Sequence, residues 1–168
     1  MTELSFPVRK REGRMSGDAV EALNAALAAR FGNRFTASAS IRAAHGHTLT
    51  WLANQPPDAV VFAETKDDVI DVVKLCARHD APITPFGVGT SLEGHVNAPH
   101  GGVSLDCSRM NAVLAVNAED LDCVVEPGVT RKQLNEHLRD SGLFFPIDPG
   151  ADASLGARRE TVPPCSRQ

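Results

Sequence analysis

Glycines dominate the stretch of this sequence that is best suited to chemistry, residues 85–95, which reads Pro-Phe-Gly-Val-Gly-Thr-Ser-Leu-Glu-Gly-His. Gly87, Gly89 and Gly94 fall within eight residues. Glycines at this density let the backbone take positive φ angles and leave successive N–H groups free to face an anion. A surface turn needs only one or two glycines, and here an apolar run of strand length comes directly before the loop. The pattern therefore predicts a backbone cradle for phosphate.

The residues around the loop argue against three better-known motifs. Gly89 to Gly94 has the glycine spacing of a nucleoside-triphosphate loop, but His95 and Val96 stand where that motif needs Lys and a hydroxyl residue. The third glycine falls two residues late for the dinucleotide fingerprint Gly-x-Gly-x-x-Gly. A serine nucleophile elbow would need glycine at Glu93. We therefore expect Ser91 to face a ligand with its hydroxyl group and not to act as a nucleophile.

The loop closely resembles the pyrophosphate-binding loop of flavoproteins of the para-cresol methylhydroxylase (PCMH, or vanillyl-alcohol oxidase) type. Within that superfamily it is most similar to the group of the glycolate oxidase D-subunit and the cytochrome-linked D-lactate dehydrogenases. Three further segments match in the family's order: Ser-Arg-Met-Asn at 108–111, Val-Glu-Pro-Gly-Val at 125–129, and the run from Phe145 to Gly156. The resemblance implies an α/β (α+β) fold that forms the first part of a PCMH-type FAD-binding domain.

The resemblance also implies the cofactor and the chemistry. The implied function is FAD binding within an FAD-linked oxidoreductase that acts on a 2-hydroxy acid, D-lactate or glycolate. Some members attach the flavin covalently through a histidine in this loop, and Thr90 stands at that position, so FAD is expected to be noncovalent. The catalytic residues are unknown, because in the family they come from a later cap region. The positions that the resemblance assigns to FAD contact are Pro85, Phe86, Gly87, Val88, Gly89, Thr90, Ser91, Leu92, Gly94, Pro149, Gly150, Asp152, Ser154 and Leu155.

After Gly156 the sequence stops matching the family and shows no periodic pattern. This change predicts a premature end or a shift of reading frame. Three interpretations stay open: part of a hydroxy-acid dehydrogenase, a flavin-binding or interaction module without catalysis, or a nonfunctional truncated product. The chain alone is expected to be inactive.

Composition limits the other classes of function. The chain has 168 residues, of which 42% are hydrophobic and 23% charged, as in a soluble globular protein of about one domain. A net charge of -4, without a basic stripe, argues against nucleic acid as a partner. The basic residues near the N-terminus have no apolar segment behind them, so we expect neither a secretory signal nor a spanning helix. The predicted location is cytoplasmic, and the oligomeric state is left open.

Cysteine and histidine spacing does not predict a metal site. The four cysteines show no Cys-x-x-Cys pair, and we expect Cys76, Cys107, Cys123 and Cys165 to be mostly buried, reduced thiols. The sequence His45-Gly46-His47 places two imidazoles near each other, but no third ligand is evident.

Periodicity and turn signals divide the chain into a tail and lead-in helix (1–55), the FAD-binding PCMH-type domain (56–156) and an unmatched C-terminal tail (157–168). The lead-in helix is expected from Ser16 to a cap at Gly32. A strand at 59–63, a helix at 65–79 and a strand at 81–86 predict a parallel βαβ unit whose second strand leads into the glycine loop. Thr65 and Asp68 should form a capping box at the start of this helix, and its expected apolar stripe is Val69, Val72, Val73 and Cys76. The later expected elements are strands at 102–106, 112–116 and 121–125, a helix from Thr130 to Gly142 with a capping box completed by Gln133, and a loop at 144–150.

Overall fold

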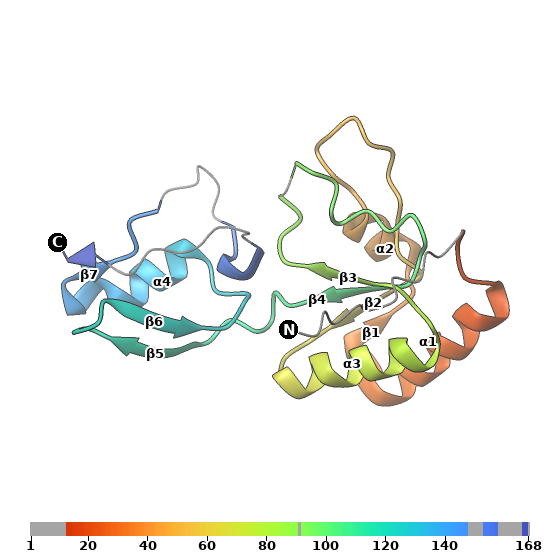
Figure 1. Cartoon of the computed structure of the whole chain (residues 1–168), viewed down its shortest axis with the longest axis horizontal. Helices are drawn as coiled ribbons and strands as arrows, with labels where there is room; N and C mark the ends of the chain where they lie inside the picture. The colour runs from red at the N-terminus through yellow and green to blue at the C-terminus, as the bar shows by residue number, and fades with distance from the viewer. Residues whose placement is uncertain (1–12, 91, 148–152, 158–165, 168) are drawn as a thin grey trace, which may run out of the picture.

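In the computed structural model, residues 13–90, 92–147, 153–157 and 166–167 are described, and they form a mixed α/β fold with two lobes (Figure 1). The helices are α1 (Gly17–Phe31), α2 (Ala39–His45), α3 (Lys66–Arg78) and α4 (Arg131–Leu138), with 3-10 turns η1 (Gly32–Arg34), η2 (Arg139–Ser141) and η3 (Leu155–Ala157). The strands are β1 (Phe35–Thr36), β2 (Ala59–Phe62), β3 (Ile83–Phe86), β4 (Val103–Asp106), β5 (Val113–Asn117), β6 (Asp122–Val125), β7 (Leu143–Phe144) and β8 (Ser166–Arg167).

The first lobe is built on a four-stranded sheet with the order β1-β2-β4-β3. β4 pairs in parallel with β2 on one side and with β3 on the other, and β1 runs antiparallel to β2. Helices α1 and α3 cover one face of this sheet and α2 lies on the other (Figure 1). The predicted parallel βαβ unit is confirmed as β2-α3-β3, with β4 inserted between its two strands.

Helix α1 forms where the sequence predicted it, with the Ser16 hydroxyl accepting from the N–H of Ala19 as N-cap. Its apolar residues Leu23, Leu27 and Phe31 are buried. They pack in one core with residues of β2, α3 and β4. The lead-in helix is therefore a structural part of the first lobe.

Helix α3 begins at the predicted capping box, in which Thr65 and Asp68 each accept from the other's backbone N–H. Val72 and Cys76 are buried, as the apolar stripe predicted. The prediction was wrong for Val73, whose exposed fraction is 47%. Helix α2 was not predicted, because residues 33–55 lack a clear apolar period.

The second lobe joins the β5-β6 hairpin to α4. Leu134 and Leu138 of α4 are buried against Val129, Leu143 and Phe145. The expected capping box at the start of α4 is only half formed. The Thr130 hydroxyl accepts from the N–H of residue 133, but the Gln133 side chain donates to the carbonyl of residue 111 instead. Residues 143–144 pair with β8, so the start of the segment expected as a loop is a short strand.

The cysteines of the described region are free thiols. Cys76 is fully buried, and burial raises the pKa of its thiol to about 12. Cys107 and Cys123 are half-buried, and Cys165 lies outside the described residues. In the part of the chain that is described, no helix is long and apolar enough to span a membrane.

Candidate functional site

The glycine loop leaves the carboxyl end of β3, which carries Pro85 and Phe86. β3 and β4 are parallel and end together, since Phe86 is paired with Asp106. Ligands of parallel α/β sheets bind at this edge. Gly89 has φ +67°, and a Cβ there would lie 3.1 Å from the Phe86 ring. The loop thus turns back over the aromatic ring at the end of its own strand, in a conformation that favours glycine.

The backbone of this loop fits an anionic group. The N–H groups of Val88, Gly89 and Thr90 have no hydrogen-bond acceptor among the described residues. Amides in consecutive positions can together bind a phosphate oxygen. Residues 85–94 contain no Lys or Arg, so the amide dipoles are the positive groups that the loop itself offers. The donor set therefore suits a diphosphate.

Side chains of the loop point largely toward solvent. Val88 is 37% exposed, Leu92 is 68% exposed, and Thr90 is also exposed. Gly94 has φ +71°, and a Cβ there would lie 2.3 Å from Cδ1 of Leu52, so this glycine allows close approach to the segment before β2. Four residues expected to contact FAD lie outside the described residues: Ser91, Pro149, Gly150 and Asp152.

Ser154 and Leu155, the other expected contacts, lie in the second lobe. Both are buried, and the N–H of Leu155 donates to the carbonyl of Val129 at 2.7 Å. The Ser154 Oγ is buried and has no hydrogen-bond partner among the described residues. Such a group is a candidate for a ligand or water contact. No hydrogen bond joins these two residues to the glycine loop in the described part of the chain.

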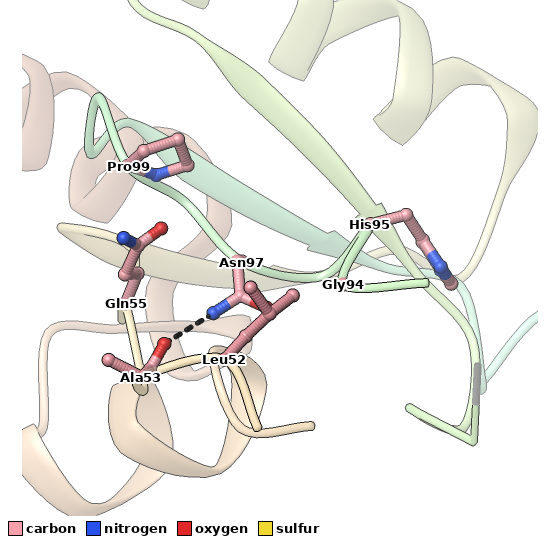
Figure 2. A pocket seen from close by; sticks show the side chains of 7 residues that line it. All are labelled: Leu52, Ala53, Gln55, Gly94, His95, Asn97 and Pro99. Carbon is pink, nitrogen blue, oxygen red and sulfur yellow. Dashed lines mark hydrogen bonds between the residues drawn. The ribbon is translucent and has the colours of Figure 1, made fainter. Parts of the chain in front are cut away.

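A pocket of about 270 Å³ lies beside the end of the loop, between segments 52–55 and 94–99 (Figure 2). Asn97 crosses between these segments, since its Nδ2 donates to the carbonyls of Gly46 at 3.3 Å and Ala53 at 2.9 Å. The pocket shares only Gly94 with the predicted FAD contacts. The pocket therefore lies at the margin of the glycine loop.

The sequence analysis did not predict a buried polar pair, formed by His45 and Asp106, beside the strand that leads into the loop. The Nε2 of His45 lies 2.9 Å from Oδ2 of Asp106. His45 and His47, which the sequence places near each other, do not share a site: His45 is buried against the sheet, whereas His47 is exposed. The available signal was the carboxylate of Asp106 at the end of a strand whose other residues are Val103, Ser104 and Leu105, because buried charges are usually paired.

Comparison with protein families gives a match to an FAD binding domain over residues 57–157, which is more than half of the chain. The chain belongs to this FAD binding domain family. FAD is therefore its cofactor, and the glycine loop lies inside the matched region. Curated relatives include a probable mitochondrial D-lactate dehydrogenase of Danio rerio, 49% identical over 116 residues, which are 69% of this chain and 23% of that protein. The glycolate oxidase subunit GlcD of Bacillus subtilis is 35% identical over 56% of this chain and 20% of that protein.

Solved structures share the fold of this FAD binding domain. p-Cresol methylhydroxylase with bound substrate has a TM-score of 0.74 at 21% identity, covering 82% of this chain and 28% of that chain. The 4-ethylphenol oxidase from Gulosibacter chungangensis has a TM-score of 0.70 at 27% identity, covering 80% and 27%. These likenesses confirm the predicted PCMH-type fold. The chain spans 18% to 23% of the length of the first curated relatives.

Proposed function

We propose that this chain holds the diphosphate of FAD on the backbone amides of residues 88–90, as part of an oxidoreductase that acts on a 2-hydroxy acid. The loop at the end of β3 carries the proposal. It combines three consecutive N–H groups that have no acceptor among the described residues with Gly89 at positive φ. Such a loop stabilises negative charge through fixed dipoles, without a lysine.

The proposed substrate class rests on the relatives named D-lactate dehydrogenase and glycolate oxidase. When bound, FAD supplies the acceptor for the electrons and hydrogen that leave the hydroxy acid. The residues of this chain bind and orient the cofactor, and we assign no catalytic base among them. Ser154 and Leu155 are proposed as cofactor contacts from the second lobe, with the Ser154 Oγ, which has no partner among the described residues, as the donor or acceptor.

Titration of the chain with FAD tests the proposal, followed by the change in flavin fluorescence. NAD and ATP serve as comparison ligands, because both carry an adenosine diphosphate group. We expect saturable FAD binding that is tighter than binding of either nucleotide. A chain that ignores FAD but binds NAD or ATP would show that the assignment is wrong.

We further propose that the flavin is noncovalent. Thr90 occupies the position where covalent relatives carry a histidine, and His95 is exposed and follows the last glycine of the loop. Acid denaturation of the FAD-loaded chain should release all of the yellow colour into the supernatant. Flavin retained on the peptide that contains His95 would contradict this proposal.

The cytoplasmic location expected from the sequence stays a proposal. Several relatives carry the word mitochondrial in their names. Fractionation of cells that produce the protein decides between the two compartments, because recovery in the organelle fraction would contradict the cytoplasmic assignment.

A further inference from the structure

His45, the last residue of α2, has both ring nitrogens hydrogen-bonded in the interior of the first lobe. It is only 7% exposed. Its Nδ1 lies 2.9 Å from the carbonyl oxygen of Ile41, and its Nε2 lies 2.9 Å from Oδ2 of Asp106. Both partners are hydrogen-bond acceptors, a backbone carbonyl at one ring nitrogen and a carboxylate at the other. Two directed bonds at opposite sides of the ring fix its plane.

Asp106 is equally constrained. It is the last residue of β4 and is 4% exposed. Its second oxygen, Oδ1, accepts from the N–H of Ser108 at 2.7 Å. Both carboxylate oxygens are therefore used, and the position of the His45 ring is tied to the turn that follows the central strand. A buried carboxylate left without such partners would be strongly unfavourable.

The fixed imidazole packs against the aromatic residues that end the neighbouring strands. Its ring centre lies 4.2 Å from that of Phe86 and 5.8 Å from that of Phe62. Two atoms of the Phe86 ring lie 3.1 and 3.2 Å from the point where a Cβ of Gly89 would stand. A continuous series of contacts thus runs from Asp106 through His45 and Phe86 to the middle of the glycine loop.

We propose that His45 is a positioning residue for the phosphate cradle. Its ring, held by Asp106 and the Ile41 carbonyl, sets the position of Phe86 beneath Gly89 and so the direction of the loop amides. A purely apolar core at this point would fill the space, but it would not fix a ring plane, because van der Waals contacts are not directional. The effect on FAD binding rests on the proposed function, whereas the effect on the loop does not.

Four variants separate positioning from simple stability. Asp106→Ala and His45→Leu break the pair. Asp106→Asn keeps it, since the Asn amide can donate to Nε2 of a neutral imidazole while its oxygen still accepts from residue 108. Asp58→Ala is the matched control, because Asp58 is a buried carboxylate of the same lobe that accepts from the N–H of Gly102, at the opposite ends of the strands.

Each variant is measured in three ways. Urea unfolding gives its stability, and NMR signals with hydrogen exchange report on the amides of residues 88–90 without cofactor. Titration gives the Kd for FAD. We expect Asp106→Ala and His45→Leu to shift the loop signals and to raise the Kd for FAD about tenfold. Asp106→Asn should stay within about twofold of the unsubstituted chain. Asp58→Ala should lose stability but keep both the loop signals and the Kd.

Unchanged loop signals in His45→Leu, or equal effects of Asp58→Ala and Asp106→Ala on the loop, would overturn the proposal. If the pair-breaking variants do not fold, Phe86→Leu decides, because it removes the ring between the intact pair and Gly89. Wild-type loop signals in Phe86→Leu would then contradict the proposal. If the unsubstituted chain does not bind FAD at all, the proposed function fails, and the loop signals alone decide the role of His45.

Discussion

Asp68 stabilises the first lobe through several donors at one buried carboxylate. It accepts from the backbone N–H groups of Glu64 and Thr65, each at 3.1 Å, and from the Arg34 guanidinium. Burial alone would raise its pKa. The bonds from Arg34 and from residues 64 and 65 outweigh that effect and lower the pKa of Asp68 from 3.8 to about 2. The ionised carboxylate is therefore favoured in the folded chain.

This lowered pKa predicts an acid-dependent loss of stability. Because the folded pKa lies below the unfolded one, the contribution is fully present above about pH 4 and disappears as the pH falls through about 2. Asp68→Asn should lower the free energy of unfolding near neutral pH by about 2 kcal/mol and flatten its decline between pH 4 and 2. Urea unfolding across this pH range measures both effects.

Asp67→Asn is the control, since Asp67 lies in the same first turn of α3 but is exposed. It should leave the acid-dependent decline in place. An Asp68→Asn variant that loses as much stability between pH 4 and 2 as the unsubstituted chain would contradict the assignment.

The backbone course of the glycine loop depends on the conformation of Gly89. Gly89→Ala should strain the loop by about 1–2 kcal/mol, because its φ of +67° is unfavourable for residues with a Cβ. The new Cβ would also press against the Phe86 ring. We expect weaker FAD binding, by about tenfold, in a fluorescence titration.

Gly142 offers a matched control for this substitution. Its φ is +71°, and a Cβ there would meet no atom within 4 Å. Gly142→Ala should therefore cost similar stability in the second lobe and leave the FAD affinity unchanged. Equal losses of affinity in the two variants would mean that Gly89 acts through general stability alone.

Features that depend on residues close together in the sequence could be predicted from it, whereas features that depend on distant residues could not. The capping box of α3 joins Thr65 to Asp68, three residues apart, so it is visible in the sequence. The pair of His45 and Asp106 joins residues 61 positions apart. The strand-end position of Asp106 indicates that it needs a partner, but no local pattern identifies His45 as that partner. The insertion of β4 between β2 and β3 is likewise set by long-range pairing.

Close backbone packing joins the two lobes. The N–H of Gly128 donates to the carbonyl of Met110 at 2.7 Å, and a Cβ on Gly128 would lie within 2.7 Å of the carbonyl oxygens of residues 107, 108 and 110. Met110 packs in the core of the first lobe, whereas Val129 packs in that of the second. The motifs at 108–111 and 125–129 thus meet in space, although the sequence shows them only as separate matches.

The chain alone should not oxidise D-lactate or glycolate. Alignment of a reacting carbon within about 3–3.5 Å of its partner can supply about 7–11 kcal/mol of a barrier. The proposed cradle offers backbone amides to a phosphate and provides no such alignment for a hydroxy acid. Anaerobic mixing of the FAD-loaded chain with D-lactate should bleach flavin absorbance no faster than with free FAD. Faster bleaching would place a substrate site within these 168 residues.

Binding of the FAD diphosphate to the amides of residues 88–90 can be measured by competition against FAD, followed by flavin fluorescence, with ADP and riboflavin as competitors. ADP carries the diphosphate, whereas riboflavin carries only the flavin ring and its side chain. We expect ADP to displace FAD and Gly89→Ala to weaken ADP and FAD in parallel, while riboflavin competes poorly. Displacement by riboflavin without displacement by ADP would show that the loop amides do not bind the diphosphate.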